Sequence, residues 1–289
     1  IISRLKNVDK RVLVSATNAI EIPKYTKIAK PTTLNFISKT DEETSLLEVK
    51  KVVSEEKDKL NTLFHLICNL NSEAAIIFCN HRDAVERISN SLNERGIVST
   101  YYHGGMDQDE RERGLIQFRN GSVPYLITTD LAARGLDIPD IKHVIHYHLP
   151  FKEEEFTHRN GRTARMKSEG TAYLIIHEDE KKMDYIDYGM PVFKLDKSAA
   201  IPKQPLFETL YISGGKKNKL NKIDIVGFLS QKGNLEKGDL GLIEVKDFIS
   251  FAAVKRSKIQ QVLKDIKDQK MKGKKYKIAI ARSVQSKEE

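Results

Sequence analysis

Between residues 46 and 195, short apolar runs alternate with segments of helical periodicity, and this pattern restricts the fold more than any other feature. Residues 74–79 form the most apolar run, which is typical of a buried strand. Val85, Ile88 and Leu92 then repeat at spacings of three and four, which predicts a helix that ends before Gly96. Further strands are expected over residues 99–102, 125–128, 144–147 and 171–176. Such alternation favours a parallel sheet with helices on both faces.

A second pattern follows a segment with two prolines. Residues 196–205 contain Pro202 and Pro205 and few large apolar side chains, which predicts a linker. Beyond it, strands are expected over residues 206–212, 240–245, 248–254 and 277–281, with helices over residues 222–232 and 258–270. This order predicts a small α+β domain over residues 206–282, in which two helices back a four-stranded sheet. The acidic run at residues 178–180, before the linker, is expected to open a helix.

The positive charge is concentrated in the last third of the chain. Residues 204–289 contain 19 Lys and Arg against 10 Asp and Glu, so this region carries the whole net charge of +9. A basic domain attached to a neutral body suggests binding to a polyanion. A solvated lysine-rich surface would have the same composition, so charge alone leaves both interpretations open.

The first residues and the cysteines indicate in which cellular compartment the protein is expected. The chain begins at Ile1, without an initiator Met or an apolar signal run, and its longest apolar stretch is much shorter than a membrane span. We therefore expect a soluble fragment of a longer protein, without membrane contact. Cys68 and Cys79 are too few for a disulfide framework, and a buried free thiol is expected for Cys79. These features favour the cytoplasm.

Residues 158–165 carry two arginines at helical spacing. Their sequence is HRNGRTAR, so Arg162 and Arg165 would project from one face of a helix. Two guanidinium groups on one face can neutralise the charge that spreads over phosphate oxygens during phosphoryl transfer. Gly161 would permit close approach of the backbone. A solvated basic helix start explains the same arginines without a ligand, and the segment alone does not decide between the two.

A polar loop follows the strand expected at residues 125–128. Thr129 begins this loop and could offer a hydroxyl and a backbone N–H to a phosphate, whereas Asp137 could accept a hydrogen bond from a ribose hydroxyl. An ordinary strand-to-helix turn, capped by Asp137, accounts for either residue singly. It does not account for the loop and the two arginines together.

Together these segments resemble the superfamily 2 helicases, and within them the DEAD-box RNA helicases, over residues 1–195. Ser15, Ala16 and Thr17 resemble motif III of that family. Residues 76–80 resemble motif IV, residues 108–111 motif IVa, residues 129–137 motif V and residues 158–165 motif VI. His158, which opens motif VI, is typical of the DEAD-box branch. The resemblance implies a RecA-like α/β lobe over residues 39–195, preceded in residues 1–38 by the tail of a first RecA-like lobe.

The resemblance also implies how the lobe meets its ligands. Arg162 and Arg165 would contact the γ-phosphate of ATP, and Asp137 its ribose, with ATP and Mg held mainly by the chain's own N-terminal lobe. Arg159 would pair with an acidic residue of that lobe, and His158 would link to residues 15–17, the segment that couples the lobes. The residues that would hold RNA by its backbone are Asn80, His81, Gly104, Arg111 and Thr129. For Arg111, an ion pair with Asp107 on the helix surface is the alternative.

Two motifs of the family are missing from this sequence. It has no phosphate loop, because Gly214, Gly215, Lys216 and Lys217 have the wrong spacing for one, and it has no DEAD tetrapeptide. Both belong to the first lobe. We therefore expect the full-length protein to be an ATP-dependent RNA helicase, whereas this chain alone is expected not to hydrolyse ATP.

Residues 206–282 resemble the RNA-binding domain appended to DbpA-type helicases, on the segments 210–217, 223–227 and 238–243. The resemblance implies a fold like that of the RNA recognition motif and a structured ribosomal RNA as target, in ribosome assembly. Tyr211 and Phe251 lie where such domains stack bases, but Ile249 replaces a usual aromatic. Lysines would then carry more of the binding, and a solvated lysine loop is the alternative. The lysines concerned are Lys216, Lys217, Lys219, Lys274 and Lys275.

Two classes of function fit these observations. The first is an ATP-dependent RNA helicase whose two lobes close around ATP and RNA, so that each ligand favours binding of the other. The second is a non-catalytic RNA-binding scaffold. Asp137, Arg162 and Arg165 favour the enzyme, because a scaffold needs no ligands for a γ-phosphate. A DNA helicase is a weaker third possibility. No metal site is expected in this part of the protein.

Overall fold

The computed structural model describes residues 47–133, 136, 138, 141–163 and 169–281, and before these residues 10, 12, 13, 22, 26, 28 and 31–34. Contacts within the chain divide it into Ile1–Ser45 and Leu46–Glu289. Most of residues 1–38, the expected tail of a first lobe, fall outside the described residues. Ser15, Ala16 and Thr17 also lie outside them.

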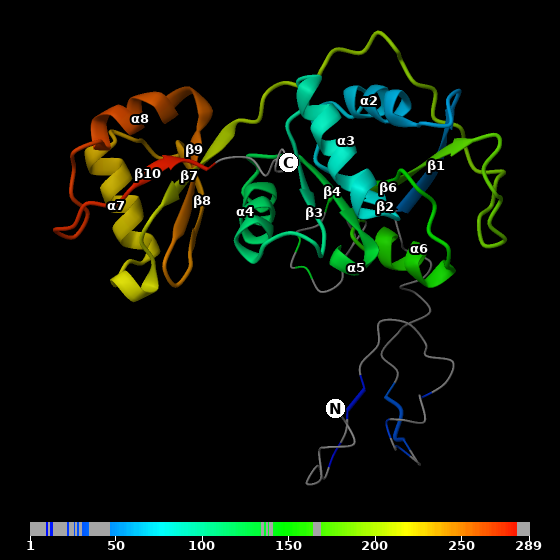
Figure 1. The fold of residues 1–289 in the computed structure, drawn as a ribbon, viewed down its shortest axis with the longest axis horizontal. Helices are drawn as coiled ribbons and strands as arrows, with labels where there is room; N and C mark the ends of the chain where they lie inside the picture. Colours follow the sequence, from blue (N-terminus) through cyan, green and yellow to red (C-terminus); the bar gives the residue numbers. More distant parts are fainter. Residues whose placement is uncertain are drawn as a thin grey trace. The chain divides into compact units, whose positions relative to one another are not determined.

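The first part of the second unit is a parallel sheet. Its order is β1-β6-β5-β2-β4-β3, and each pair of neighbouring strands is parallel (Figure 1). The strands are β1 Leu47–Ser54, β2 Ala75–Cys79, β3 Ser99–Tyr102, β4 Tyr125–Thr129, β5 His143–His146 and β6 Gly170–His177. The helices are α2 Leu60–Cys68, α3 Arg82–Glu94, α4 Gln108–Arg119, α5 Asp130–Ala133 and α6 Glu153–Asn160. The predicted RecA-like architecture is confirmed.

Strand β2 shows why its sequence is apolar throughout. Side chains alternate between the faces of a strand, and both faces of this sheet are covered. Ile77 packs into one core with Leu66 of α2 and Ile88 of α3. Ile76 packs into another core with Phe118 of α4. The strand therefore lies at the centre of the lobe, and the polar residues that follow the strands gather at the carboxyl edge of the sheet.

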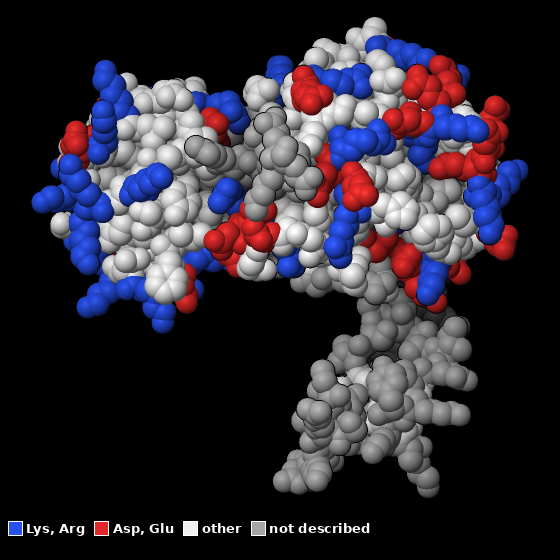
Figure 2. All heavy atoms as spheres, viewed as in Figure 1, with Lys and Arg blue, Asp and Glu red and all other residues white. Residues whose placement is uncertain are grey.

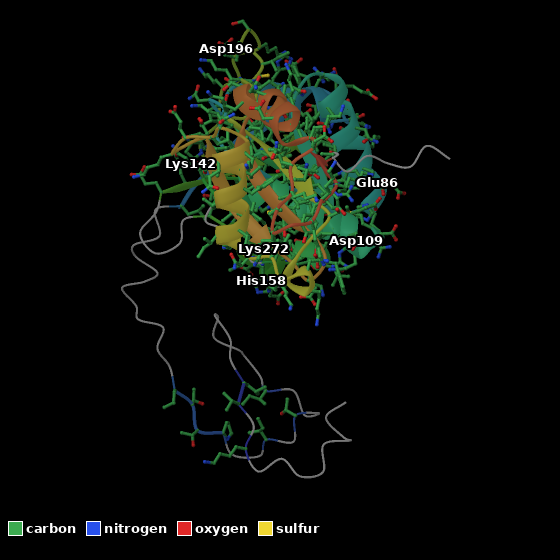
Figure 3. The ribbon with its side chains drawn as sticks, turned by 90° about the vertical axis from the view of Figure 1, so that its left-hand side faces the viewer. Glu86, Asp109, Lys142, His158, Asp196 and Lys272 are labelled. Carbon is green, nitrogen blue, oxygen red and sulfur yellow. The ribbon has the colours of Figure 1, made fainter. Side chains whose placement is uncertain are left out.

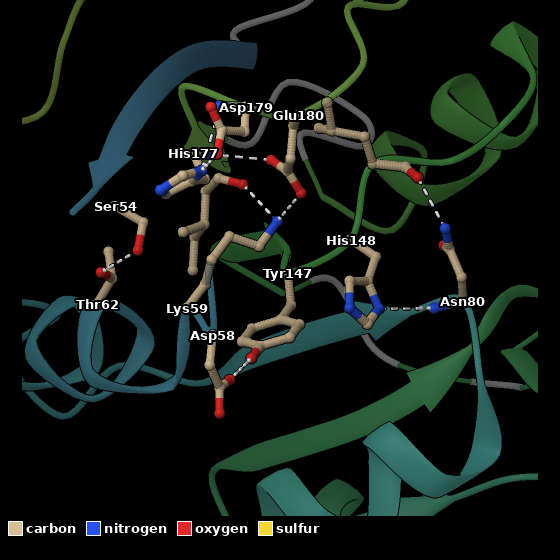
Figure 4. A network of polar contacts seen from close by, with 12 residues as sticks. Ser54, Asp58, Lys59, Thr62, Asn80, Tyr147, His148, His177, Asp179 and Glu180 are labelled. Atoms are coloured by element: carbon tan, nitrogen blue, oxygen red, sulfur yellow. Dashed lines mark hydrogen bonds and ion pairs between the residues drawn. The ribbon is translucent and has the colours of Figure 1, made fainter. Parts of the chain in front are cut away.

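The helix expected to open at residues 178–180 is absent, and this prediction was wrong. Residues 178–180 form a turn instead. The carboxylate of Glu180 accepts from the backbone N–H of His177 at 3.1 Å and from Lys59 Nζ at 2.6 Å (Figure 4). Lys59 is only 2% exposed and also donates to the carbonyl of Ile175. A buried ammonium needs such a partner, so tertiary pairing overrides the local helix signal.

The second part is a small antiparallel sheet backed by helices α7 and α8. Its strand order is β10-β7-β9-β8. The strands are β7 Phe207–Ile212, β8 Leu240–Val245, β9 Ser250–Lys255 and β10 Ile278–Ile280, and the helices are α7 Lys222–Lys232 and α8 Ile259–Ile266. Asn221 caps α7 and exchanges hydrogen bonds with Asp224. The predicted α+β domain is confirmed.

One face of the small sheet forms the core of this domain. Leu210 and Ile212 of β7 and Ala252 of β9 are fully buried with Ile225 of α7 and Val262 of α8. Residues between them in sequence therefore point to the opposite face of the sheet.

Both cysteines are buried and free, as expected for Cys79. Burial raises the pKa of the Cys79 thiol to about 12. Within the described residues, none of the helices is long and apolar enough to cross a membrane.

Candidate nucleotide and nucleic-acid interface

Three residues that the sequence assigned to RNA line a single cavity beside the carboxyl ends of β3 and β4. Gly104, Arg111 and Thr129 line it together with Arg82, and its volume is about 440 Å³. Arg82 was not predicted, although it directly follows the predicted Asn80–His81 contact in the sequence. It opens α3, and the structure thus adds a second arginine to the cavity.

Tyr102 holds Arg111 in place. Arg111 donates to the Tyr102 hydroxyl from Nη2 at 3.0 Å and from Nε at 3.3 Å. The guanidinium carbon also lies 5.2 Å from the centre of the Tyr102 ring. From the sequence, this arginine was expected either to bind RNA or to form an ion pair with Asp107. The structure shows that the last residue of β3 positions its side chain.

The loop after β3 brings backbone close to Arg82. A Cβ added at Gly104 would lie 3.5 Å from Arg82 Nη2, and one added at Gly105 would lie 3.2 Å from His103 Nδ1. His103 Nδ1 accepts from the Gly105 N–H at 3.1 Å, while His103 Nε2 lies 2.8 Å from a Glu86 oxygen. His103 is 4% exposed and fixes this turn, so the backbone beside Arg82 is rigidly held.

Arg159 is buried in a polar network inside the lobe. Its Nε and Nη2 donate to the two carboxylate oxygens of Asp130, each at 2.6 Å. Nη1 donates to the carbonyl of His148 at 2.6 Å, and Nη2 to Asn80 Oδ1 at 2.9 Å. The guanidinium has no exposed surface left for an acidic residue of another lobe, since Arg159 is 1% exposed. Within this chain the partner of Arg159 is Asp130, which sequence reasoning did not single out, and the predicted pairing with another lobe stays a prediction.

The same network explains Asn80. Asn80 Oδ1 accepts from Arg159, and its Nδ2 donates to the carbonyl of Leu149 at 2.9 Å (Figure 4). Both ends of the side chain therefore bind the protein, and the predicted RNA contact of Asn80 stays a prediction. His81 is exposed at the start of α3, and its predicted RNA contact remains a prediction.

His146 lies beneath Arg159 and is fully buried. Its Nε2 donates to Asn160 Oδ1 at 2.9 Å, so Nε2 carries a hydrogen. Burial, and then the charge of Arg159, lower the pKa of His146 to about 3. The ring is therefore neutral at physiological pH.

Arg162 and His158 lie at the exposed end of this network. Arg162 donates to the carbonyl of Leu136 at 3.0 Å and to that of Ala133 at 2.9 Å, so the turn after α5 orients its guanidinium. His158 is exposed on α6 (Figure 3). With Asp130 they line a shallow hollow. Asp137 and Arg165, the other residues assigned to ATP, lie outside the described residues.

The aromatic face of the small sheet is covered by the helicase lobe. Tyr211 and Phe251 are paired in register on β7 and β9, and their rings meet edge to face at 5.8 Å. Phe251 is 1% exposed and shares a buried cluster with Ile116 of α4 and Ala281. Tyr211 and Ile249 pack against this cluster. Phe251 is therefore not accessible to a base in this arrangement, and base stacking on Tyr211 and Phe251 stays a prediction.

Polar contacts surround this apolar cluster. Asn120 Nδ2 donates to Thr209 Oγ1 at 2.8 Å, and Thr209 donates in turn to Ser122 Oγ at 2.9 Å. Gln117 donates to the carbonyl of Ala281 at 3.2 Å. These contacts match donors to acceptors where polar groups are buried, as a specific interface requires.

The predicted lysines lie on exposed loops of the same domain. Figure 2 shows Lys and Arg side chains crowding this domain, with few acidic ones among them. Lys216, Lys217, Lys219 and Lys274 are exposed, and none of them forms an ion pair with another described residue. Lys275 pairs with Asp268 at 3.1 Å across the surface. The fold brings Lys219 beside the loop that carries Lys274 and Lys275, because Lys272 Nζ donates to the Lys219 carbonyl at 2.9 Å.

Two protein families match the two parts of the chain. Residues 58–167 match the helicase conserved C-terminal domain, and residues 209–280 match the DbpA RNA binding domain. The chain thus carries the C-terminal lobe of a helicase followed by a specialised RNA-binding domain. These two matches correspond to the C-terminal region of a DEAD-box RNA helicase with a DbpA RNA-binding domain.

Individual relatives agree with both matches. The chain is 31% identical to the ATP-dependent RNA helicase DbpA of Bacillus subtilis, over 77% of this chain and 52% of that protein. It is also 31% identical to the DbpA of Escherichia coli, over 78% of this chain and 50% of that protein. The chain thus spans about half the length of these curated relatives. Among solved structures, the E. coli DEAD-box protein SrmB bound to a regulator of ribonuclease activity is 30% identical, with a TM-score of 0.47, over 54% of this chain and 96% of that one.

Proposed function

We propose that this chain is the part of an ATP-dependent RNA helicase that completes the ATP and RNA sites when two lobes close, and that the enzyme unwinds short RNA duplexes. The observation that carries the proposal is the cavity where Arg82, Arg111, Gly104 and Thr129 meet. Two guanidinium groups, a backbone turn without side chains and a hydroxyl form a surface suited to sugar and phosphate. Contacts of this kind hold RNA without selecting its sequence.

Arg162 is the described residue that would meet ATP. Its guanidinium is already oriented by the carbonyls of Ala133 and Leu136, so little reorganisation is needed when a phosphate approaches. ATP supplies the phosphoryl group whose transfer to water drives the cycle. With Asp137 and Arg165, Arg162 would contribute positive charge and ribose contacts, while an upstream lobe would hold the remaining phosphates and Mg. We propose that this chain alone does not hydrolyse ATP.

The RNA-binding domain would select where the motor acts. Its exposed lysines support binding to a polyanion, and the DbpA domain match supports RNA as that polyanion. We propose a structured ribosomal RNA as the target, with a role in ribosome assembly and a cytoplasmic location. The packing of this domain against α4 supports a fixed rather than a flexible attachment to the motor.

The decisive experiment joins this chain to its upstream lobe and replaces Arg162 by Ala. RNA-stimulated ATP hydrolysis is expected to fall roughly a thousandfold or more, as for other arginines that meet a transferred phosphate. The matched control is Arg87→Ala, because Arg87 forms an exposed ion pair with Asp58. Near-normal ATPase activity in Arg162→Ala, together with intact RNA binding, would favour the non-catalytic scaffold.

A further inference from the structure

Three loops of the RNA-binding domain meet on the side that the lysines occupy. The backbone N–H of Lys216 donates to the carbonyl of Lys246 at 2.8 Å, and that of Lys217 to the carbonyl of Asp247 at 2.8 Å. Lys272 donates to the carbonyl of Lys219. We call the surface formed by residues 215–219, 246–248 and 270–275 the three-loop surface.

Gly215 explains how the first two loops come so close. A Cβ at this position would lie 2.2 Å from the Lys246 carbonyl oxygen and 2.7 Å from that of Asp247, so any other residue would push the loops apart. The two loops therefore form one fixed unit. Side chains at their tips are held in defined positions relative to each other.

An exposed aromatic side chain lies at the tip of the second loop. Phe248 connects β8 to β9 and is 68% exposed. Its loop is the one whose carbonyls accept from the backbone of Lys216 and Lys217, so this exposed ring belongs to the same surface as the lysines, which the exposed Phe151 of the helicase lobe does not. The nearby lysines make an anionic ligand the best fit, because Lys216 and Lys217 form no ion pair with any described residue.

The usual stacking position is not available in this arrangement. Phe251 is 1% exposed beneath α4, and Tyr211 is partly buried beside it. The aromatic face of the sheet is therefore closed to an RNA base in this arrangement, whereas residues 216–219, 247, 248 and 272–275 of the three-loop surface are exposed. An exposed aromatic ring can stack on a base while lysines of the adjoining loops neutralise neighbouring phosphates.

We propose that Phe248 is an RNA-binding residue that stacks on an unpaired base, with Lys216, Lys217 and Lys219 binding the phosphates on either side. This inference rests on the proposed RNA binding of the domain and deepens it by naming the site. The sheet face serves to attach the domain to the lobe, and the three-loop surface serves to bind RNA.

The test uses the whole chain and a hairpin RNA with an eight-nucleotide single-stranded tail as probe. Phe248→Ala is expected to weaken binding roughly 5- to 100-fold, with an unchanged dependence on salt, because stacking is lost and the phosphate contacts remain. Phe151→Ala is the matched control, because Phe151 is a phenylalanine of the same 68% exposure in the helicase lobe. The control is expected to bind like the unmodified chain.

Phe248→Trp supplies a second and direct readout, because the chain contains no tryptophan. This variant is expected to keep its affinity, and its fluorescence should be quenched when RNA binds. Full affinity of Phe248→Ala, or an unquenched Trp in a complex of normal affinity, overturns the stacking site while RNA binding by the domain stands. Failure of the unmodified chain to bind the probe would instead overturn the proposed function on which the site depends.

Discussion

The guanidinium of Arg119, on α4 of the helicase lobe, donates a hydrogen bond to the carboxylate of Glu244, on β8 of the RNA-binding domain. Both side chains are largely buried, with 19% and 16% of their surfaces exposed. The ion pair lies at the same interface as the apolar cluster of Ile116 and Phe251. It links the motor to the domain that we propose selects the RNA, so it offers a way to test whether the two move together.

Reversing this ion pair is expected to open the interface. Arg119→Glu places two carboxylates together and should weaken domain docking by about 1.5–3 kcal/mol, the usual contribution of a charged hydrogen bond. Adding Glu244→Arg should restore most of the loss. Tyr211→Trp, introduced as the reporter, should show red-shifted emission in the single reversal and not in the double. If Tyr211→Trp has equal emission in the chain with the native ion pair, in the single reversal and in the double reversal, that result would contradict a docked domain.

Removing the partner of Arg159 is expected to destabilise the lobe strongly. Asp130→Asn leaves a buried guanidinium without its counter-charge, which typically costs about 3–5 kcal/mol. Chemical denaturation of the chain measures this loss. The comparison is Glu55→Gln, which breaks the exposed pair with Lys197 and should change stability by about 1 kcal/mol or less. A similarly small effect of Asp130→Asn would show that the network does not require the ion pair.

His146 is expected to make the lobe sensitive to acid. The pKa of this buried histidine falls from 6.5 to about 3 on folding, so the unfolded chain binds the proton first as pH falls. Its stabilising contribution is complete above about pH 6.5 and is lost at up to about 1.4 kcal/mol per pH unit towards pH 3. His146→Gln should flatten the dependence of unfolding free energy on pH between 6.5 and 4. An unchanged slope would assign the acid sensitivity to other groups, such as His148, whose pKa is lowered to about 4.

Tyr102 is expected to increase the affinity for RNA by positioning the guanidinium of Arg111. Tyr102→Phe keeps the ring beneath the guanidinium but removes the hydroxyl that accepts two of its hydrogen bonds. RNA affinity of the protein joined to its upstream lobe should fall about 3- to 10-fold, and less than in Arg111→Ala. Tyr101→Phe is the control, because Tyr101 is the preceding residue of β3 and packs into the opposite core. Normal affinity in Tyr102→Phe would leave Arg111 positioned by other contacts.

Local sequence patterns determined most of the architecture of this protein. The apolar run of β2 and the periodicity of Val85, Ile88 and Leu92 predicted a strand and a helix that the structure contains. The bounds of α7 and β8 agree with the predicted residues 222–232 and 240–245. Side-chain periods of 3.6 and 2 residues are local properties, so they can be read from neighbouring positions. The cavity residues Gly104, Arg111 and Thr129 were predicted from the resemblance of their segments to DEAD-box helicase motifs, and the structure brings them together.

Only the tertiary structure decided which partners the side chains meet. The period of β9 places Phe251 on one face of its sheet, but it does not say that α4 covers that face. The resemblance assigned Arg159 an acidic partner in another lobe, yet within this chain a carboxylate 29 residues earlier, that of Asp130, pairs with it. Burial and pairing depend on contacts between segments that are distant in sequence, and no local pattern records them. The sequence thus predicted two domains and their charges, whereas the structure packs the sheet face against the helicase lobe and leaves exposed the three-loop surface at which we propose that RNA binds.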